Sequence, residues 1–446
     1  MTAVDADHGR DSDRITDRVI LLTVCAYAAA FVVFGFVVDT PERIFVGLIE
    51  IITTRDALLT DYFGAGGIGA ACVNAGVLTL VVSFIYYKAQ AKLSGASVAC
   101  LFLVLGFGLF GKNILNIWFI VLGVLLYARF KGEAFTEHIN TAFFGTALAP
   151  VFSEILFSTS LPIEARLPLS IVTSLATGFV LTPAAAQLFK AHMGFSLYNM
   201  GFTAGIVGTL VVAIYKSYGF IPEPVMIWTT GHNLLLSEFL SVLFISMIAI
   251  GLYADGSVLP KLKQIVDSSG QAPTDFISLV GFAPTLVNMG LTGAIGTAYV
   301  LLIGGDLNGP VIGAILTIVG FSAFGKHPRN IIPIMAGVFV GALAKPWNAS
   351  DPSVTLAALF GTTLAPIAGR FGWHWGVVAG FVHSSAALSV GYLHAGLNLY
   401  NNGFAAGIVA AVLVPVIMAV DPRNNRDREP TSDRPNGRVH GSEASH

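Results

Sequence analysis

The sequence predicts an all-α integral membrane protein built from two related halves. Of its 446 residues, 54% are hydrophobic and only 11% are charged, whereas a typical soluble domain carries roughly 25% charged residues. Apolar runs long enough to cross the hydrocarbon core recur along almost the whole chain. A series of motifs in the first half also recurs in the same order in the second half, which indicates an internal duplication.

The apolar runs are continuous rather than alternating, so they predict helices and not barrel strands. About fourteen hydrophobic segments can be drawn, about seven in each half, and the shorter ones are candidates for re-entrant or broken helices. These segments cover residues 19–38, 65–87, 94–111, 113–129, 139–158, 166–189, 196–216, 234–253, 277–303, 308–324, 330–345, 354–369, 373–393 and 403–420.

The segments divide the chain into five parts. We expect a disordered N-terminal tail (1–18), membrane repeat 1 (19–217), an inter-repeat loop (218–233), membrane repeat 2 (234–420) and a disordered C-terminal tail (421–446). The C-terminal tail is rich in charge and poor in apolar residues, a composition typical of disorder. Residues 43–52, between the first two segments, form an amphipathic stretch.

The duplication rests on paired motifs. A Gly-Phe-x-x-Phe-Gly-Lys stretch ends at Lys112 and again at Lys326. The other pairs are Thr60-Asp61 with Thr274-Asp275, Val73-Asn74-x-Gly76 with Val287-Asn288-x-Gly290, Phe144 to Pro150 with Phe360 to Pro366, and Leu197 to Phe202 with Leu399 to Phe404. Because each half holds an odd number of segments, the second half is expected to be inverted in the membrane.

The loop charges predict an orientation. Lysine and arginine are more frequent in the loops that follow even-numbered segments than in the opposite loops. The positive-inside rule then places both termini in the cytoplasm of a multi-pass protein of the cell membrane.

The two repeated lysines are the main candidates for a binding site. A charge at membrane depth is costly and usually lines a pathway or meets an opposite charge. Lys112 and Lys326 each precede a new helical segment, whose free N–H groups add partial positive charge that favours an anion. The alternative interpretation is that both lysines reach from short loops to the lipid headgroups.

Several polar residues near these motifs complete the candidate binding site. Asn113, Asn116 and Asn330 follow the lysines, and Tyr198, Asn199, Tyr400 and Asn401 belong to the repeated Tyr-Asn-x-Gly-Phe motif. Asparagine and glycine at the mouth of a helix can expose backbone groups to a solute. The alternative is that the asparagines cap helices and the glycines permit close packing.

Three ionisable residues are candidates for proton or ion coupling. Glu154, Glu238 and His383 lie within apolar segments, where such residues are often functional. Each could equally make a structural polar contact. Pro150 and Pro366 are expected to interrupt their helices, because proline removes a backbone hydrogen bond.

No motif indicates an enzyme, a cofactor, a metal centre or nucleic-acid binding, so the expected partners are the lipid bilayer and a small solute. The three cysteines lie in apolar segments without metal-ligand spacing. A homo-oligomer is compatible with the sequence.

The Phe-Gly-Lys, Phe-Gly-Thr-x-Leu-Ala-Pro and Leu-Tyr-Asn-x-Gly-Phe stretches resemble those of an uncharacterised bacterial membrane protein family, a domain of unknown function. The resemblance covers nearly the whole chain and implies no established activity. The Leu-Tyr-Asn-x-Gly-Phe stretch is also similar to a Gly-Tyr-Asn-Gly stretch of urea channels, which have two inverted halves. The phenylalanine and the spacing depart from that pattern.

The expected function is transport of a small solute, favoured as secondary transport of a small anion or carboxylate at the interface between the repeats. The paired lysines favour the anion, and the lack of an ATP-binding motif favours an ion gradient as energy source. The alternatives are a passive small-solute channel, or an intramembrane enzyme or assembly factor that uses His383 and Glu154. The sequence leaves open the substrate, the coupling ion and the depth of the two lysines.

Overall fold

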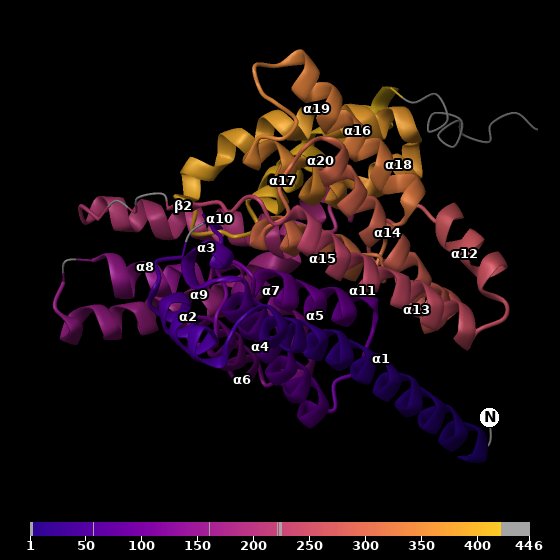
Figure 1. Ribbon diagram of the computed structural model, residues 1–446, viewed down its shortest axis with the longest axis horizontal. Helices are drawn as coiled ribbons and strands as arrows, with labels where there is room; N and C mark the ends of the chain where they lie inside the picture. Colours follow the sequence, from indigo (N-terminus) through magenta and orange to yellow (C-terminus); the bar gives the residue numbers. More distant parts are fainter. Residues whose placement is uncertain (1–2, 57, 160, 221, 223–224, 421–446) are drawn as a thin grey trace, which may run out of the picture.

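The computed structural model describes residues 3–56, 58–159, 161–220, 222 and 225–420, with residues 3–15 described by their backbone alone. The described residues are almost entirely helical, as the sequence predicts (Figure 1). The elements of the first half are α1 (Ala3–Val38), α2 (Pro41–Thr53), β1 (Leu59–Thr60), α3 (Tyr62–Gly66), α4 (Ile68–Ala89), α5 (Gly95–Phe107), α6 (Trp118–Lys131), α7 (Phe135–Gly145), η1 (Thr146–Leu148), α8 (Pro150–Ser158), α9 (Ile163–His192) and α10 (Asn199–Ser217).

The α-helices of the second half follow the same order as those of the first. Its elements are β2 (Met226–Ile227), α11 (Asn233–Ala254), α12 (Val258–Asp267), α13 (Phe276–Val280), α14 (Phe282–Leu302), α15 (Gly309–Phe321), α16 (Pro328–Ala344), α17 (Pro352–Gly361), η2 (Thr362–Leu364), α18 (Ala365–Phe371), α19 (Trp373–Val390), η3 (Gly391–His394) and α20 (Asn401–Val420). In Figure 1 the first half fills the lower part of the view and the second half the upper part.

Each of the fourteen expected segments contains a helix, but not all of them can cross a membrane. The described residues hold 10 helical stretches that are long and apolar enough to do so, five in each half. The helices α5 and α15 have 13 residues each, which corresponds to about 20 Å, against a hydrocarbon core of about 30 Å. These two helices are therefore short enough to be the broken or re-entrant segments that the sequence predicts.

One detail differs from the sequence prediction. Residues 3–18, expected to be a disordered tail, continue helix α1. This stretch contains no proline, so an apolar helix can propagate into it at little cost. The C-terminal tail lies outside the described residues.

The expected helix interruptions are present. A turn of 3₁₀ helix, η1, separates α7 from α8 just before Pro150, and η2 separates α17 from α18 close to Pro366. Pro150 and Pro366 have no N–H for the carbonyl oxygen four residues earlier, and that oxygen instead accepts the N–H of the residue just before the proline, which produces the 3₁₀ turn.

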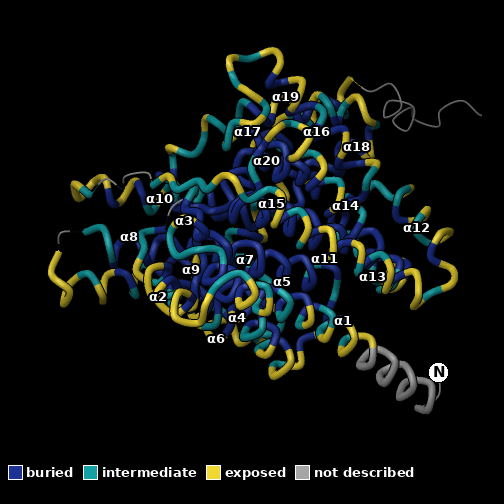
Figure 2. Tube along the Cα trace, in the orientation of Figure 1, coloured by how far each residue is buried: buried dark blue, intermediate teal, exposed yellow. Residues whose placement is uncertain are grey.

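The outer helices present apolar surface. Exposed residues of α1, α9, α11 and α19 include Leu22, Val172, Val242 and Val378, and Figure 2 shows the exposed tube at the periphery around a buried centre. In an aqueous protein such surface would be a liability, whereas acyl chains cover it in a bilayer. The arrangement is that of a multi-pass membrane protein.

The two halves are joined through equivalent helices. An added methyl group on Gly106 of α5 would lie 2.7 Å from the carbonyl oxygen of Gly313 in α15, and one on Gly95 would lie 2.1 Å from that of Ala323. Later residues of α5 thus lie beside earlier residues of α15, so the two helices pack antiparallel. Close helix contact needs small residues at the crossing, which explains the glycines.

A second pair of equivalent helices, α10 and α20, packs in the same manner. The added methyl group of Gly201 would contact Tyr400 and Gly403, and that of Gly407 would contact Phe202. These contacts join the first turns of the two helices.

Reciprocal helix caps hold the halves together. Asp61 of the first half accepts the backbone N–H of Gly309 at the start of α15, at 3.1 Å. Its repeat partner, Asp275, accepts the N–H of Gly95 at the start of α5, at 3.2 Å. Each half therefore supplies the carboxylate that satisfies the free N–H groups of the other half's short helix.

Candidate functional site

The two repeated lysines lie in loops that the broken helices create. After α5, the chain turns through Gly111 at φ +76°, a left-handed conformation that favours glycine, and reaches Lys112. Asn74 on α4 donates to the carbonyl oxygens of Gly108 and Lys112 at 2.7 and 2.9 Å. The amide group thereby fixes the loop.

The second half builds the same loop with its own residues. Asn288 on α14 donates to the carbonyl oxygens of Ser322 and Lys326, both at 2.8 Å. The repeated Val-Asn-x-Gly motif is thus the clamp of the lysine loop in each half.

Both lysines are fully buried, with 0% of Lys112 and of Lys326 exposed. The alternative interpretation, in which they reach the lipid headgroups, does not fit this burial. A buried ammonium group must find oxygen acceptors or aromatic faces to offset the loss of water. Both lysines find aromatic faces.

Lys326 is fully engaged by the protein. Its Nζ donates to the hydroxyl oxygen of Tyr198 and, at 2.8 Å, to Oγ1 of Thr362. The same atom lies 4.5 Å from the ring centre of Tyr198 and 5.5 Å from that of Phe321. Because Tyr198 comes from the first half, this contact crosses the interface between the halves.

Lys112 lacks the equivalent hydrogen bonds. Its Nζ lies 4.9 Å from the ring centre of Phe107, yet within the described part of the chain it has no hydrogen-bond partner. The hydroxyl of Tyr400, the repeat partner of Tyr198, is also buried without one among these residues. Two equivalent sites thus differ in how their polar groups are satisfied.

An aromatic cluster separates the two lysines at the interface. The ring centres of Tyr198 and Tyr400 are 5.2 Å apart, Phe107 lies 4.8 Å from Tyr400, and Phe321 lies 4.6 Å from Tyr198. Phe144 and Phe360 pack against Phe321 and Phe107, respectively. The aromatic cluster therefore consists of Phe107, Phe144, Tyr198, Phe321, Phe360 and Tyr400.

Two cavities border the aromatic cluster, and they are repeat equivalents. The larger has a volume of about 210 Å³, and the smaller about 110 Å³. Equivalent residues line the two: Phe144, Leu197, Asn199 and Phe324 line the larger cavity, and Phe360, Leu399, Asn401 and Phe110 line the smaller one. The same architecture is thus more open in one copy than in the other.

Asn199 and Asn401 lie at these cavities, but protein groups hold their side chains. Oδ1 of Asn199 pairs with Nε2 of His192 at 2.9 Å, and Oδ1 of Asn401 pairs with Nε2 of His394 at 3.0 Å. Both amide groups also donate to a carbonyl oxygen of the preceding membrane helix. These matched pairs brace the starts of α10 and α20.

The asparagines after the lysines shape the loops. Asn116 donates to the carbonyl oxygen of Gly111 at 3.1 Å and accepts from the N–H of Asn113. Asn330 donates to the carbonyl oxygen of Gly325 at 2.9 Å and accepts from the N–H of His327. These hydrogen bonds hold the lysine loops in shape. This is the structural capping role that was the alternative to a solute-binding role.

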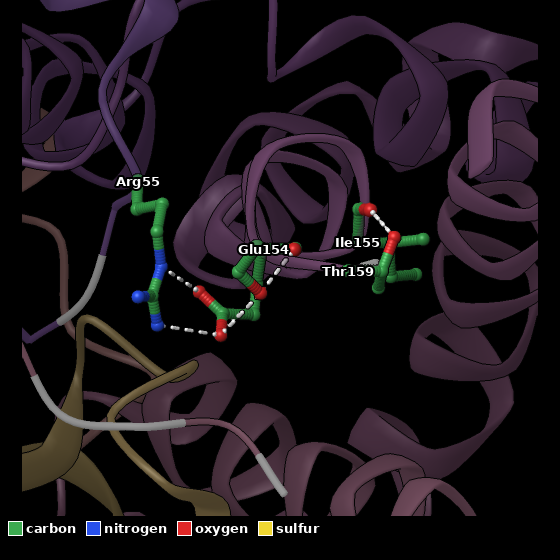
Figure 3. A network of polar contacts seen from close by, with 5 residues as sticks. Arg55, Glu154, Ile155 and Thr159 are labelled. Carbon is green, nitrogen blue, oxygen red and sulfur yellow. Dashed lines mark hydrogen bonds and ion pairs between the residues drawn. The ribbon is translucent and has the colours of Figure 1, made fainter. Parts of the chain in front are cut away.

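The three coupling candidates lie in different environments. Glu154 on α8 forms a bidentate ion pair with Arg55 at 3.0 and 3.3 Å (Figure 3). Glu238 is exposed on α11. His383 on α19 is fully buried, and its Nε2 lies 3.1 Å from Oδ1 of Asn402.

Asp56, which no sequence pattern indicated, lies between α2 and β1. Its buried carboxylate accepts hydrogen bonds from Tyr62 and Ser153, both at 2.6 Å, and from Asn116 at 2.9 Å. Loss of water raises the pKa of Asp56 to about 7, although these hydrogen bonds partly offset the rise. Through Asn116, the carboxyl group is connected to the loop of Lys112.

Fold and site together define a polytopic α-helical membrane protein with a buried polar interface between two homologous halves. The chain belongs to the family described as "Protein of unknown function (DUF1576)", which matches residues 40–217 and 254–419. The two matched regions fall in the two halves, which confirms the predicted duplication. No curated protein matches the chain, and no solved structure does either.

Proposed function

We propose that the protein transports a small solute across the cell membrane through the interface between its two halves. The observation that carries this proposal is the pair of equivalent cavities that border the aromatic cluster. Transporters with internal repeats bind their substrates between the repeats, near discontinuous helices. The short helices α5 and α15, with their lysine loops, supply such discontinuities.

The unequal cavities favour a transporter over a passive channel. A channel needs one continuous path, whereas alternating access needs a site that opens to one side at a time. Here the rings of the aromatic cluster touch between the cavities, and one cavity is about twice the volume of the other. Because the sequence has no ATP-binding motif, an ion gradient is the proposed energy source.

The proposal includes an inverted relation between the halves. Equivalent helices related by a two-fold axis perpendicular to them run antiparallel, as α5 and α15 do, whereas an axis along them would make them parallel. Five full-length helices in each half, with or without a re-entrant hairpin, also give an odd number of crossings. The loop charges favour a cytoplasmic N-terminus. Because the two halves together make an even number of crossings, the C-terminus lies on the same side.

Two equivalent positions test the inversion. Lys88 and Leu302 are exposed at the ends of α4 and α14. In a variant without native cysteines, Lys88→Cys should react with a membrane-impermeant thiol reagent only from the cytoplasmic side, and Leu302→Cys only from outside. Labelling of both from the same side would refute the inverted arrangement.

Uptake into proteoliposomes tests the transport. Ala96 lines the larger cavity, so Ala96→Trp should fill it and reduce uptake of a transported solute at least tenfold. Ala254→Trp, at an exposed position near the end of α11, is the matched control and should retain uptake. Normal uptake by Ala96→Trp would exclude this route, and uptake independent of any imposed ion gradient would identify a channel.

A further inference from the structure

The two lysine sites have the same parts but different contacts. One triad consists of Lys326, Phe321 and Tyr198, and the other of Lys112, Phe107 and Tyr400. The ring centres of the aromatic pair are 4.6 Å apart in the first triad and 4.8 Å in the second. The rings are thus placed almost alike, and the difference lies in the lysine side chain.

In the triad of Lys326, the ammonium group closes directly on the tyrosine hydroxyl and on Thr362. In the triad of Lys112, the ammonium group lies over Phe107 instead. Thr362 and its repeat partner Thr146 each donate to a helix carbonyl oxygen at 2.6 Å, so the two threonines differ only in whether they also accept from a lysine. The oxygen atoms that hold Lys326 therefore have repeat counterparts, and within the described residues the ammonium group of Lys112 bonds to neither of them.

Within the described residues, the two groups that have no hydrogen-bond partner share one aromatic neighbour. The ring of Phe107 contacts both Nζ of Lys112 and the ring of Tyr400. Tyr400 also lines the larger cavity. The buried ammonium group and the buried hydroxyl group therefore offer two hydrogen-bond donors beside the same ring, one of them on a residue that lines a cavity.

We propose that Lys112 Nζ and the Tyr400 hydroxyl bind the carboxylate group of a small monocarboxylate, and that Lys326 with Tyr198 is the closed form of the equivalent site. One cation matches one negative charge, and two donors match the two oxygens of a carboxylate. The surrounding rings suit an apolar remainder, whereas a phosphate dianion would bring a second uncompensated charge. This inference rests on the proposed function, because it names the substrate class of the interface.

The pair of triads also gives the transport cycle a structural basis. When a carboxylate leaves Lys112, the ammonium group can form the bonds to Tyr400 and Thr146 that Lys326 forms with Tyr198 and Thr362. Breaking the bonds of Lys326 would then open the equivalent site beside the larger cavity, which Tyr198 and Phe321 line. The two arrangements are related by the repeat, so they are expected to be similar in energy.

A binding experiment on the full-length protein in nanodiscs tests the site. The probes are acetate and benzoate, with acetamide and benzamide as neutral analogues of the same shape and chloride as an anion without paired oxygens. Calorimetric titration should show binding of at least one carboxylate and at least tenfold weaker binding of its amide. Absence of carboxylate binding, or equal binding of chloride or the amide, would overturn the proposal.

Variants assign the binding to the two donors. Lys112→Met should weaken carboxylate binding at least tenfold, and Tyr400→Phe, which removes a single oxygen atom, should weaken it by about three- to tenfold. Lys345→Met is the control, because the ammonium group of Lys345 bonds to Phe381 and Ser384 away from the aromatic cluster. If Lys112→Met fails to fold, unchanged affinity of Tyr400→Phe still refutes the site.

Uptake measured in parallel separates this inference from the proposed function. If the protein binds carboxylates at Lys112 but transports none of them into proteoliposomes, the binding site is supported and the proposed transport is refuted. If the protein transports a neutral solute but binds no carboxylate, the proposed transport is supported and the carboxylate site is refuted.

Discussion

Lys112 and Lys326 occupy equivalent places in the two halves, yet only Lys326 donates hydrogen bonds to protein oxygens within the described structure. Both lie on loops clamped by an asparagine, both are fully buried, and both contact a phenylalanine ring. The sequence repeat therefore specifies where the ammonium groups lie, and the conformation decides which of them is satisfied.

This difference has an energetic meaning. Burial of an ammonium group costs several kcal/mol, and the cost is common to both sites. Only one site recovers part of it through charge-assisted hydrogen bonds. A molecule with two such sites can exchange which one is closed, and that exchange is what alternating access requires.

The largest difference in stability is expected between the variants Lys326→Met and Lys112→Met. The desolvation cost is removed in both variants, so it cancels in the comparison. Lys326→Met also loses two hydrogen bonds from a charged donor, each worth about 1.5–3 kcal/mol. We expect its free energy of unfolding to be lower than that of Lys112→Met by about 3 kcal/mol or more, measured by denaturant titration in the same detergent without ligand.

Equal stability of the two methionine variants would contradict the unequal hydrogen bonding of Lys112 and Lys326. It would mean that the two lysines are in equivalent surroundings in solution. If Lys112 binds the anion, saturating acetate should stabilise Lys326→Met, which retains Lys112, but not Lys112→Met, and should therefore narrow the difference in stability between the two variants.

Asp56 provides a second contrast, because its repeat partner in the other half is Gly270, which carries no acid. The pKa of Asp56 is raised from 3.8 to about 7 by burial, so between these values the folded state holds a proton that the unfolded state has released. Stability should therefore fall as the pH rises from about 4 to 7 and then level off, by up to a few kcal/mol. Asp56→Asn should lack this contribution.

Denaturation at a series of pH values measures the effect, with Glu154→Gln as a control for the neighbouring ion pair. An unchanged pH profile in Asp56→Asn would contradict the raised pKa.

The residues that sequence reasoning found are those that repeat. Phe-Gly-Lys, Val-Asn-x-Gly and Leu-Tyr-Asn-x-Gly-Phe occur in both halves, and each proved to be part of the interface or of its support. Duplication preserves the contacts that both halves need, so it marks the lysine loops without any knowledge of the fold. The fourteen helical segments followed from apolar length alone.

What the sequence could not provide depends on contacts between distant segments. Glu154 reads as an isolated acid, but Arg55 lies beside it in the folded chain. Asn199 reads as a solute ligand, but His192 occupies its carbonyl oxygen. Asp56 is matched by a glycine in the other half and lies outside the apolar runs, so neither the repeat nor the hydrophobic pattern could indicate it.

The tyrosines should give a smaller contrast than the lysines. Tyr198→Phe removes one acceptor from the ammonium group of Lys326, whereas Tyr400→Phe removes a hydroxyl that is buried without a partner among the described residues. We expect Tyr198→Phe to lower the free energy of unfolding by about 1–3 kcal/mol and Tyr400→Phe to leave it unchanged or raise it. Thermal and denaturant unfolding of the two variants checks this, and a loss of similar size in both would contradict the unequal triads.

The smallest contrast is expected between Thr362→Val and Thr146→Val. Each substitution removes a hydroxyl that donates to a helix carbonyl oxygen at 2.6 Å, so this loss cancels in the comparison. Thr362→Val also removes the acceptor that lies 2.8 Å from Nζ of Lys326, while Tyr198 remains to hold the ammonium group. The variant should be less stable than Thr146→Val by about 1 kcal/mol. Denaturant titration of both variants resolves a difference of this size, and the reverse order would indicate that the triad of Lys112, and not that of Lys326, is the closed one.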